Sequence, residues 1–199
     1  GINFVTKKKA FEIESDNDEY ILVPASVMPL KDSKMFVMGN YFKKTDNIAK
    51  DYSQGIAVYE VDNRGKVLSK TYNTWTEDFA AYLPTNSRGK IANIGFLYIH
   101  KMVQTSDGKV FVVGEGYKRQ ADGVGIALTA LSALGGSYGR TGVTKIVVTD
   151  IVMMEFNNKF KVSNATIFNK ANNTAVAGAM SDYTSQHALA LYLKMTSSF

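Results

Sequence analysis

The sequence has no cysteine, which excludes a disulfide scaffold, a thiolate metal site and a cysteine nucleophile. It has only two histidines, His100 and His187, and neither has a second histidine or a cysteine close by. Because a metal site needs several such ligands, we expect both to be structural or surface residues, and we predict no metal and no cofactor. No apolar run approaches the ~20 residues of a membrane span, so we expect none.

Proline is scarce as well, with 3 residues against 11 tyrosines, 11 phenylalanines and one tryptophan. This balance favours β-strands. With 199 residues, of which 45% are apolar and 21% charged, the chain has the composition of a globular domain rather than of a disordered tail, a fibre or a coiled coil. Its length suits a single domain that buries its own core.

An excess of positive charge is small: 23 Lys and Arg face 18 Asp and Glu, for a net charge of +5. The basic run Lys7–Lys9 is followed at once by acidic residues and does not resemble a recognition helix. We therefore expect no nucleic-acid partner. The chain starts with Gly1 rather than Met, which is typical of tag removal or of truncation after a signal peptide. We therefore predict a periplasmic or secreted bacterial protein.

An approximate internal repeat is the clearest positive feature. The segments Lys34–Tyr41 and Lys109–Tyr117 are both apolar runs interrupted by a glycine, and Thr174–Met180 is a weaker third copy. Asp107-Gly108 before the second copy is a strong hairpin signal. The glycine in each copy suits a bulge or a place where another backbone approaches closely.

Each copy is followed by a second apolar strand, and in the first two units an Asp or Asn turn comes next. These followers are Gly55–Val61, Asp150–Phe156 and His187–Leu193. Together with flanking segments, the pattern predicts units of four consecutive antiparallel strands. The approximate units are 20–75, 94–168 and 172–199, the last incomplete, with an insertion at 119–144 that includes a short helix around Ile126–Leu134.

Such units resemble the blades of a β-propeller and are most similar to the degenerate repeats of uncharacterised bacterial propeller-like proteins. The resemblance covers Tyr20 to about Tyr192, without a Trp-Asp dipeptide or a paired-glycine kelch signature. The glycine-to-glycine intervals exceed the ~40–50 residues of common blades, and two full units fall short of the usual ~4–8. The sequence therefore predicts an all-β fold of antiparallel four-stranded units, propeller-like and complete or partial, with a β-sandwich as the alternative. A missing remainder of the ring would be supplied by further blades or by a homo-oligomer.

Four residues are candidates for ligand binding. Glu115 directly follows Gly114, where a propeller strand reaches the rim or the channel; the alternative is a residue of a β-bulge. The aromatic residues Tyr72, Trp75 and Tyr82 lie in a turn-rich connection and suit stacking on sugars or partner side chains; the alternative is core or inter-sheet packing.

Signatures of catalysis are weak. There is no Gly-x-Ser-x-Gly elbow, and the acidic stretch Asp16–Glu19 lacks the glycine and the distal glutamate of a calcium loop. The glycine-rich stretch Gly135–Gly142 lacks the lysine of a phosphate-binding loop. Carboxylates are present, but sequence gives no reason to pair any two: Glu60, Glu77, Asp78, Glu115, Asp150 and Glu155.

These observations predict a non-enzymatic binding or scaffold module that presents the loops of a β-repeat to a protein or glycan partner. The alternative is a hydrolase or lyase that acts on polysaccharide through acidic residues. No residue is assigned a catalytic role.

Overall fold

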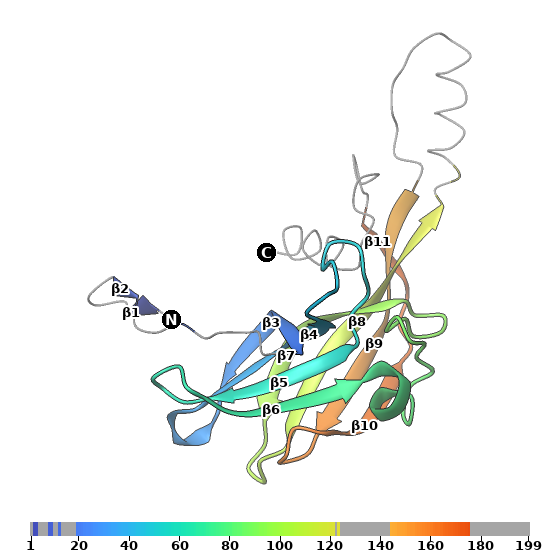
Figure 1. The fold of residues 1–199 in the computed structure, drawn as a ribbon. Coiled ribbons are helices and arrows are strands. Elements are labelled where there is room, and N and C mark those ends of the chain that lie inside the picture. The colour runs from blue at the N-terminus through green and yellow to red at the C-terminus, as the bar shows by residue number, and fades with distance from the viewer. Residues whose placement is uncertain are drawn as a thin grey trace.

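The computed structural model describes residues 19–121 and 144–175, together with the short pieces 2–3, 8–9, 12 and 123. Two antiparallel sheets dominate this part of the chain, each built on four consecutive strands (Figure 1), and the short strand β11 (Asn173–Ala175) is a fifth strand of the second sheet. The first sheet contains β3 (Tyr20–Pro29), β4 (Met35–Lys43), β5 (Gly55–Val61) and β6 (Val67–Thr74). The second contains β7 (Phe96–Gln104), β8 (Val110–Ala121), β9 (Thr144–Phe156) and β10 (Val162–Phe168). The predicted all-β class and its antiparallel four-stranded units are thereby confirmed.

Smaller elements complete the described residues. They are β1 (Ile2–Asn3), β2 (Lys8–Lys9), β11 (Asn173–Ala175), the 3-10 turn η1 (Lys31–Ser33) and the π-helical turn η2 (Trp75–Phe79). The β11 strand pairs with the first half of β9. Several predicted features lie outside the described residues: the acidic residues 16–18, the helix at 126–134, the glycine-rich loop 135–142, His187 and the third unit beyond Ala175.

Strand order within each sheet follows chain order, so each sheet is a meander whose register is set by its turns. Between β5 and β6, Asp62 Oδ1 accepts hydrogen bonds from the backbone N–H groups of Arg64 and Lys66, at 2.9 and 2.8 Å. Between β9 and β10, Asn157 Oδ1 accepts them from Lys159 and Lys161, at 2.9 and 3.1 Å. An Asp or Asn side chain that bonds the backbone two residues on stabilises a turn, which explains why both units carry one there.

The glycines of the two repeats occupy equivalent places. Gly39 lies opposite a bulge in β3, and Gly114 lies opposite a bulge in β7. A Cβ added at Gly39 would overlap the carbonyl oxygen of Val23, and one added at Gly114 would overlap that of Tyr98. The predicted close approach of another backbone is therefore confirmed at both glycines.

The repeat extends to side-chain contacts. Lys34 Nζ lies 2.8 Å from Glu60 Oε1 in the first sheet, and Lys109 Nζ lies 2.7 Å from Glu155 Oε1 in the second. In each pair the lysine precedes the second strand of the sheet and the glutamate lies near the end of the third. The two sheets can therefore be compared position by position.

This comparison defines two faces of each sheet. In the first sheet, face A carries Met28, Phe36, Met38, Ile56, Val58 and Asn73, and face B carries Val37, Ala57, Tyr59 and Val61. In the second sheet, the equivalent positions on face A are Val103, Phe111, Val113, Ile151, Met153 and Phe168, and those on face B are Val112, Val152, Met154 and Phe156.

The main core lies between face A of the first sheet and face B of the second. Phe36, for example, packs edge-on against Phe156 and Phe160, with ring centroids 6.5 and 5.1 Å apart. Burial of each such side chain contributes about 1.5–3 kcal/mol. Because different faces of the repeat meet, the two sheets pack head to tail, as a heterologous contact does, rather than through a shared face.

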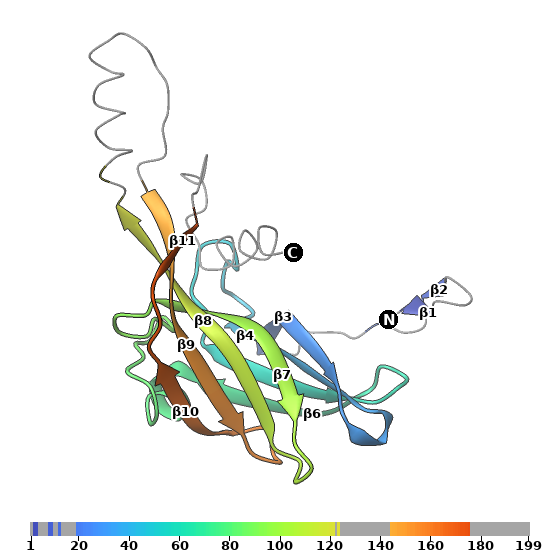
Figure 2. The same cartoon turned by 180° about the vertical axis from the view of Figure 1, so that it is seen from behind.

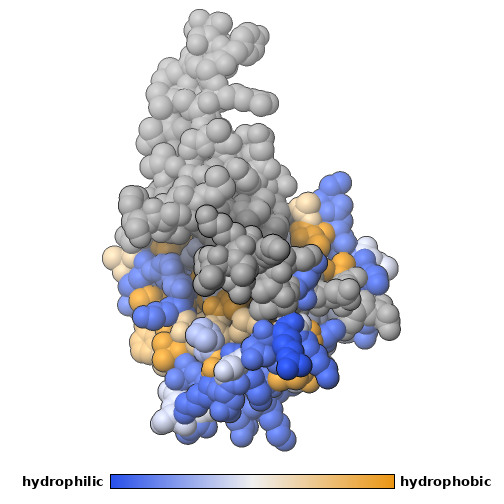
Figure 3. Space-filling view, turned by 90° about the vertical axis from the view of Figure 1, so that its left-hand side faces the viewer, coloured by the Kyte–Doolittle hydropathy of each residue, from blue (hydrophilic) through white to orange (hydrophobic). Residues whose placement is uncertain are grey.

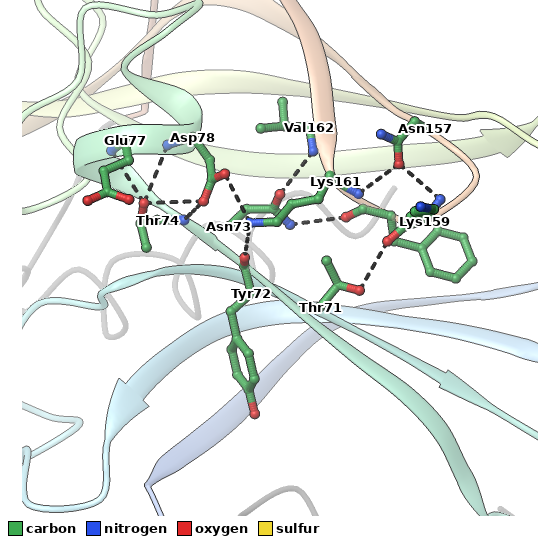
Figure 4. Close-up of polar contacts among 11 residues, drawn as sticks. Thr71, Tyr72, Asn73, Thr74, Glu77, Asp78, Asn157, Lys159, Lys161 and Val162 are labelled. Carbon is green, nitrogen blue, oxygen red and sulfur yellow. Dashed lines mark hydrogen bonds and ion pairs between the residues drawn. The ribbon is translucent and has the colours of Figure 1, made fainter.

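Polar contacts close one seam between the sheets (Figure 4). Asn73, which is fully buried, donates from Nδ2 to the carbonyl of Phe160 at 3.1 Å and accepts on Oδ1 from the N–H of Val162 at 2.9 Å. Lys161 Nζ donates to the carbonyl of Tyr72 at 2.7 Å and lies 3.0 Å from Asp78 Oδ1. The β9–β10 turn is thus fixed to β6 of the other sheet.

The η2 turn continues from this seam into the core. Thr74 Oγ1 accepts from the N–H groups of Glu77 and Asp78, both at 3.3 Å, and caps the turn as an N-cap threonine does. Burial raises the pKa of Asp78, but hydrogen bonds from the Thr74 N–H and from Lys161 outweigh it, so that this pKa is lowered. Trp75 and Phe79 then fill the core beside each other, with ring centroids 4.8 Å apart.

In the second sheet, β8 and β9 extend beyond the ends of β7 and β10. β8 and β9 remain paired up to Ala121 and Thr144 and project as a long arm (Figure 1), and β11 pairs with β9 within it at residues 146–148. Arg119 pairs with Ile146 within this arm. Of the predicted insertion at 119–144, residues 119–121 continue β8 and Thr144 begins β9; except for Gly123, the residues between lie outside the described part of the chain.

Candidate functional site

Face A of the second sheet is the candidate functional site. Figure 2 shows the strands β7, β8, β9 and β10 from behind, with the short strand β11, which pairs with the first half of β9, beside them. Six apolar side chains of this face are partly or largely exposed: Val103, Phe111, Val113, Ile151, Met153 and Phe168. The ladder places Lys101, Glu115, Glu155 and Thr166 on the same face. An ordered sheet face of this composition is typical of an interaction surface.

In the first sheet, the side chains at the equivalent positions are buried. Met28 is 8% exposed, whereas its equivalent Val103 is 49% exposed. Asn73 is 0% exposed, whereas its equivalent Phe168 is 46% exposed. The difference arises because the second sheet covers face A of the first, and no described element covers face A of the second.

A charged cluster lies on this face, centred on Glu115 of β8. Its Oε2 lies 2.7 Å from His100 Nε2, and its Oε1 lies 2.9 Å from Lys170 Nζ. The backbone N–H of Lys170 donates to Asp150 Oδ1 at 3.1 Å. His100 is the extra residue of the β7 bulge, and the Tyr98 ring packs edge-on against it at 5.0 Å.

The cluster satisfies its own charges. Burial raises the pKa of Glu115, but hydrogen bonds from Lys170 and His100 outweigh this and lower it below the usual value. Glu115 is therefore ionised at neutral pH and is held between two basic groups. Glu115 therefore connects β7, β8 and the segment after β10. This is a structural role.

Other carboxylates of the described residues are paired in the same way. Glu60, Glu155 and Asp78 form ion pairs with Lys34, Lys109 and Lys161. A glycosidase-type site needs two carboxyl groups facing one another across a cleft. These three instead make contacts that repeat in both sheets or join them, which is a structural role.

The aromatic candidates do not meet Glu115. Trp75 is 2% exposed and donates from Nε1 to Ser53 Oγ at 3.1 Å, so it lies in the core rather than on a rim. Tyr82, just after η2, is 42% exposed. Tyr72 lies on face B of the first sheet. The four predicted residues therefore lie in four separate places and form no common site.

Tyr72 belongs to a tyrosine cluster with Tyr20, Tyr41 and Tyr59. Its ring lies 5.0, 4.9 and 6.3 Å from theirs, and its hydroxyl lies 3.2 Å from that of Tyr59. Burial raises the pKa of Tyr41. Inter-sheet or core packing, the alternative stated for the aromatic residues, describes Tyr72 and Trp75 in this structure.

One further side of the described surface is mixed. Figure 3, which shows the side at the left of Figure 1, has hydrophilic residues interspersed with hydrophobic patches. Such interspersion is usual for a solvated surface.

The sequence did not predict that His100, Lys170 and Asp150 lie close to Glu115. The Asp107-Gly108 turn sets up the β7–β8 hairpin, in which Glu115 pairs with Tyr98, and the bulge at His100 then brings the imidazole to Glu115. Lys170 reaches Glu115 from the segment between β10 and β11, which both pair with β9, and no local pattern signals that contact.

Within the residues that the structure describes, no group of three or more His, Cys, Asp or Glu side chains is arranged to hold a metal ion. The same residues include no helix of the length and apolarity that a membrane crossing requires.

None of the curated proteins matches this chain. A family model described as a family of unknown function, DUF6770, matches residues 1–199. Because this match spans the sequence, the chain belongs to the DUF6770 family.

Proposed function

We propose that this chain is a non-enzymatic binding or scaffold module and that face A of its second sheet receives a protein partner. The observation that carries the proposal is the contrast between equivalent positions. Face A is buried in the first sheet and open in the second, although both are built from the same repeat.

The head-to-tail packing supports a propeller-like arrangement of the two sheets. In a propeller, successive four-stranded sheets are arranged radially, so that one face of each blade covers the other face of the next. The two sheets here likewise meet through different faces, face A of the first and face B of the second. We propose that they are consecutive units of such an arrangement and that the docked partner continues it.

A protein fits this face better than a glycan. Its exposed side chains are mostly branched aliphatic or methionine, which pack against other apolar side chains. Sugar recognition needs hydrogen-bonding groups that are free to meet hydroxyls. The carboxylates at this face are already bonded, Glu115 to His100 and Lys170 and Glu155 to Lys109.

Site-specific photo-crosslinking tests the proposal. A photoreactive phenylalanine analogue is introduced in place of Val103 or of Phe168, in cells of the source organism, and the crosslinked peptides are sequenced by mass spectrometry. The matched control position is Val27, which is 58% exposed on the first sheet. We expect both test positions to crosslink to one common protein sequence that the control does not reach. Identical adducts from all three positions, or none, would contradict the proposal.

A further inference from the structure

We infer that the outer edge of β10 is a second binding site, which accepts an extended segment of a partner protein as an added β-strand. β10 lies at one end of the strand order of its sheet and pairs with β9 alone. This site differs from the one proposed above, because it consists of the backbone of an edge strand rather than of the side chains of face A. Three observations support it: the direction of the backbone groups, a contact that already uses this edge, and the contrast with the other edge strands.

The β9 strand directs alternate backbone groups towards β10. Next to the turn, the N–H of Asn157 donates to the carbonyl of Lys161 at 2.9 Å. In an antiparallel pair, successive residues point their backbone groups alternately towards the partner strand and away from it. Every second residue of β9 therefore directs its N–H and C=O groups towards β10, namely Glu155, Met153 and Ile151.

The same alternation leaves two residues of β10 with outward backbone groups. Thr166 lies opposite Met153 and so bonds to β9, as does Phe168 two residues further on. The N–H and C=O groups of Ala165 and Ile167 then point away from the sheet. Within the part of the chain that the structure describes, no loop and no side chain bonds to the backbone of either residue. These are the groups that an added strand binds.

One contact in the structure already uses this edge (Figure 4). At the start of β10, the side chain of Asn73 donates to the carbonyl of Phe160 at 3.1 Å and accepts from the N–H of Val162 at 2.9 Å. An amide that donates and accepts side by side binds a strand as the backbone of a neighbouring strand does. The outward groups of Ala165 and Ile167 follow along the same edge.

The other edge strands carry features that oppose strand addition. β3 contains two prolines and a bulge, β6 contains a bulge and Lys70, and β7 contains the bulge at His100 followed by Lys101. Prolines, bulges and lysines protect exposed edges against pairing. After its own bulge at Ser163, β10 instead continues in regular register without proline or charge over Asn164–Phe168. It is the edge best suited to a further strand.

The side chains of β10 define the segment that fits. Ala165 and Ile167 are half-buried and pack against the main core, whereas Thr166 and Phe168 are exposed on face A. Side chains of adjacent strands pair with those on the same face. A complementary segment therefore has an apolar residue, such as valine, at each position that bonds to β10, and a polar residue, such as threonine, at the positions between them.

Two synthetic peptides test the inference on the intact 1–199 chain. In both, threonine and valine alternate between terminal lysines. The probe has methylated threonine nitrogens, so the edge that carries the valine N–H groups stays open for β10. The matched control has methylated valine nitrogens, which blocks that edge and leaves the side chains unchanged. Hydrogen exchange at single amides of the chain is followed by NMR.

We expect the amides of Ala165 and Ile167 to exchange at least about tenfold faster than those of Thr166 and Phe168 in the free chain, because their N–H groups face solvent. At a concentration of about ten times its dissociation constant, the probe should slow exchange at Ala165 and Ile167 about tenfold. The control peptide should leave it unchanged. Val103→Lys, on the opposite edge strand of the sheet, should not alter the effect of the probe.

Amides of Ala165 and Ile167 that already exchange as slowly in the free chain as those of Thr166 and Phe168 would overturn the inference. Equal effects of the two peptides, or no effect of the probe at millimolar concentration, would do so as well. The proposed docking on face A is tested independently, since crosslinking from Val103 does not involve the edge of β10. Either result can fail while the other stands.

Discussion

Val103 and Met28 occupy the same position of a repeated strand, yet Val103 is 49% exposed and Met28 is 8% exposed. Both residues pair with a phenylalanine on the next strand, Phe111 and Phe36 respectively. The difference lies in what covers them, since the second sheet packs on the first and no described element packs on the second. An open copy of a normally buried face is the physical basis of the proposed docking surface.

Replacement of Asn73 should destabilise the contact between the sheets. Asn73→Ala leaves the Phe160 carbonyl and the Val162 N–H without their side-chain partner in a buried seam. We expect the free energy of unfolding to fall by about 2–4 kcal/mol, measured by urea titration. The control Asn164→Ala, at an exposed position of β10, should change it by less than about 0.5 kcal/mol. Equal effects of the two substitutions would contradict this account of the seam.

Adding a methyl group at the repeat glycines should also be costly. The new Cβ of Gly114→Ala overlaps the carbonyl oxygen of Tyr98, which is backbone and cannot rotate away. We expect a loss of about 2–3 kcal/mol in the free energy of unfolding, the range of overpacking. Gly108→Ala is the control, because its φ is +86° but nothing lies within 4 Å; there we expect about 1 kcal/mol. A larger loss at Gly108 than at Gly114 would count against the predicted close approach.

The two aromatic candidates should respond in opposite ways. Trp75→Ala removes a buried ring and its bond to Ser53, so we expect a loss of about 3–5 kcal/mol in the free energy of unfolding. Tyr82→Ala removes an exposed ring and should change it by about 0.5 kcal/mol or less. Chemical denaturation of both variants checks the pair of values. A well-folded Trp75→Ala protein of unchanged stability would show that Trp75 is not a core residue.

Glu115 should make the stability of the fold depend on acid. Its pKa is lowered from 4.5 in the folded state, so its stabilising effect is fully present above that value and is lost as the pH falls through the lowered pKa. The charges that face it are His100 and Lys170. We expect Glu115→Gln to cost about 0.5–1 kcal/mol at pH 7, as partly exposed ion pairs do, and progressively less below pH 4.5.

The measurement for Glu115 is urea unfolding of the wild type and of Glu115→Gln at neutral and at acidic pH. Glu77→Gln is the matched control, since Glu77 is exposed and forms no part of the cluster. A difference between Glu115→Gln and the wild type that stays constant down to strongly acidic pH would contradict the assignment.

Much of the fold was predictable because its signals are local. Alternating apolar strands, the turns at Asp62 and Asn157, and the glycines at positions 39 and 114 each reflect contacts between neighbouring strands. The four-stranded units and the close approach at Gly39 and Gly114 follow from these patterns. The repeat also predicted equivalent strands, which is what allows Val103 to be compared with Met28.

The site was less predictable because it depends on how whole sheets meet. Nothing local distinguishes Phe36, which is buried, from Phe111, which is partly exposed at the same repeat position. Trp75 lies in a connecting segment, yet the η2 turn directs it into the core. The bonds of Glu115 require the β7 bulge at His100 and the segment between β10 and β11 that carries Lys170. No local sequence pattern signals either of them.

Cysteine labelling tests the central claim most directly, since the chain has no cysteine of its own. Single variants Val103→Cys, Met28→Cys and Val27→Cys are reacted with a thiol reagent, first as dilute purified protein and then in cells of the source organism. The account predicts that Met28→Cys is protected in both settings and Val27→Cys reacts in both. Val103→Cys should react when dilute and be protected in the cell. Equal labelling of Val103→Cys in the two settings would contradict the claim that face A of the second sheet is a docking surface.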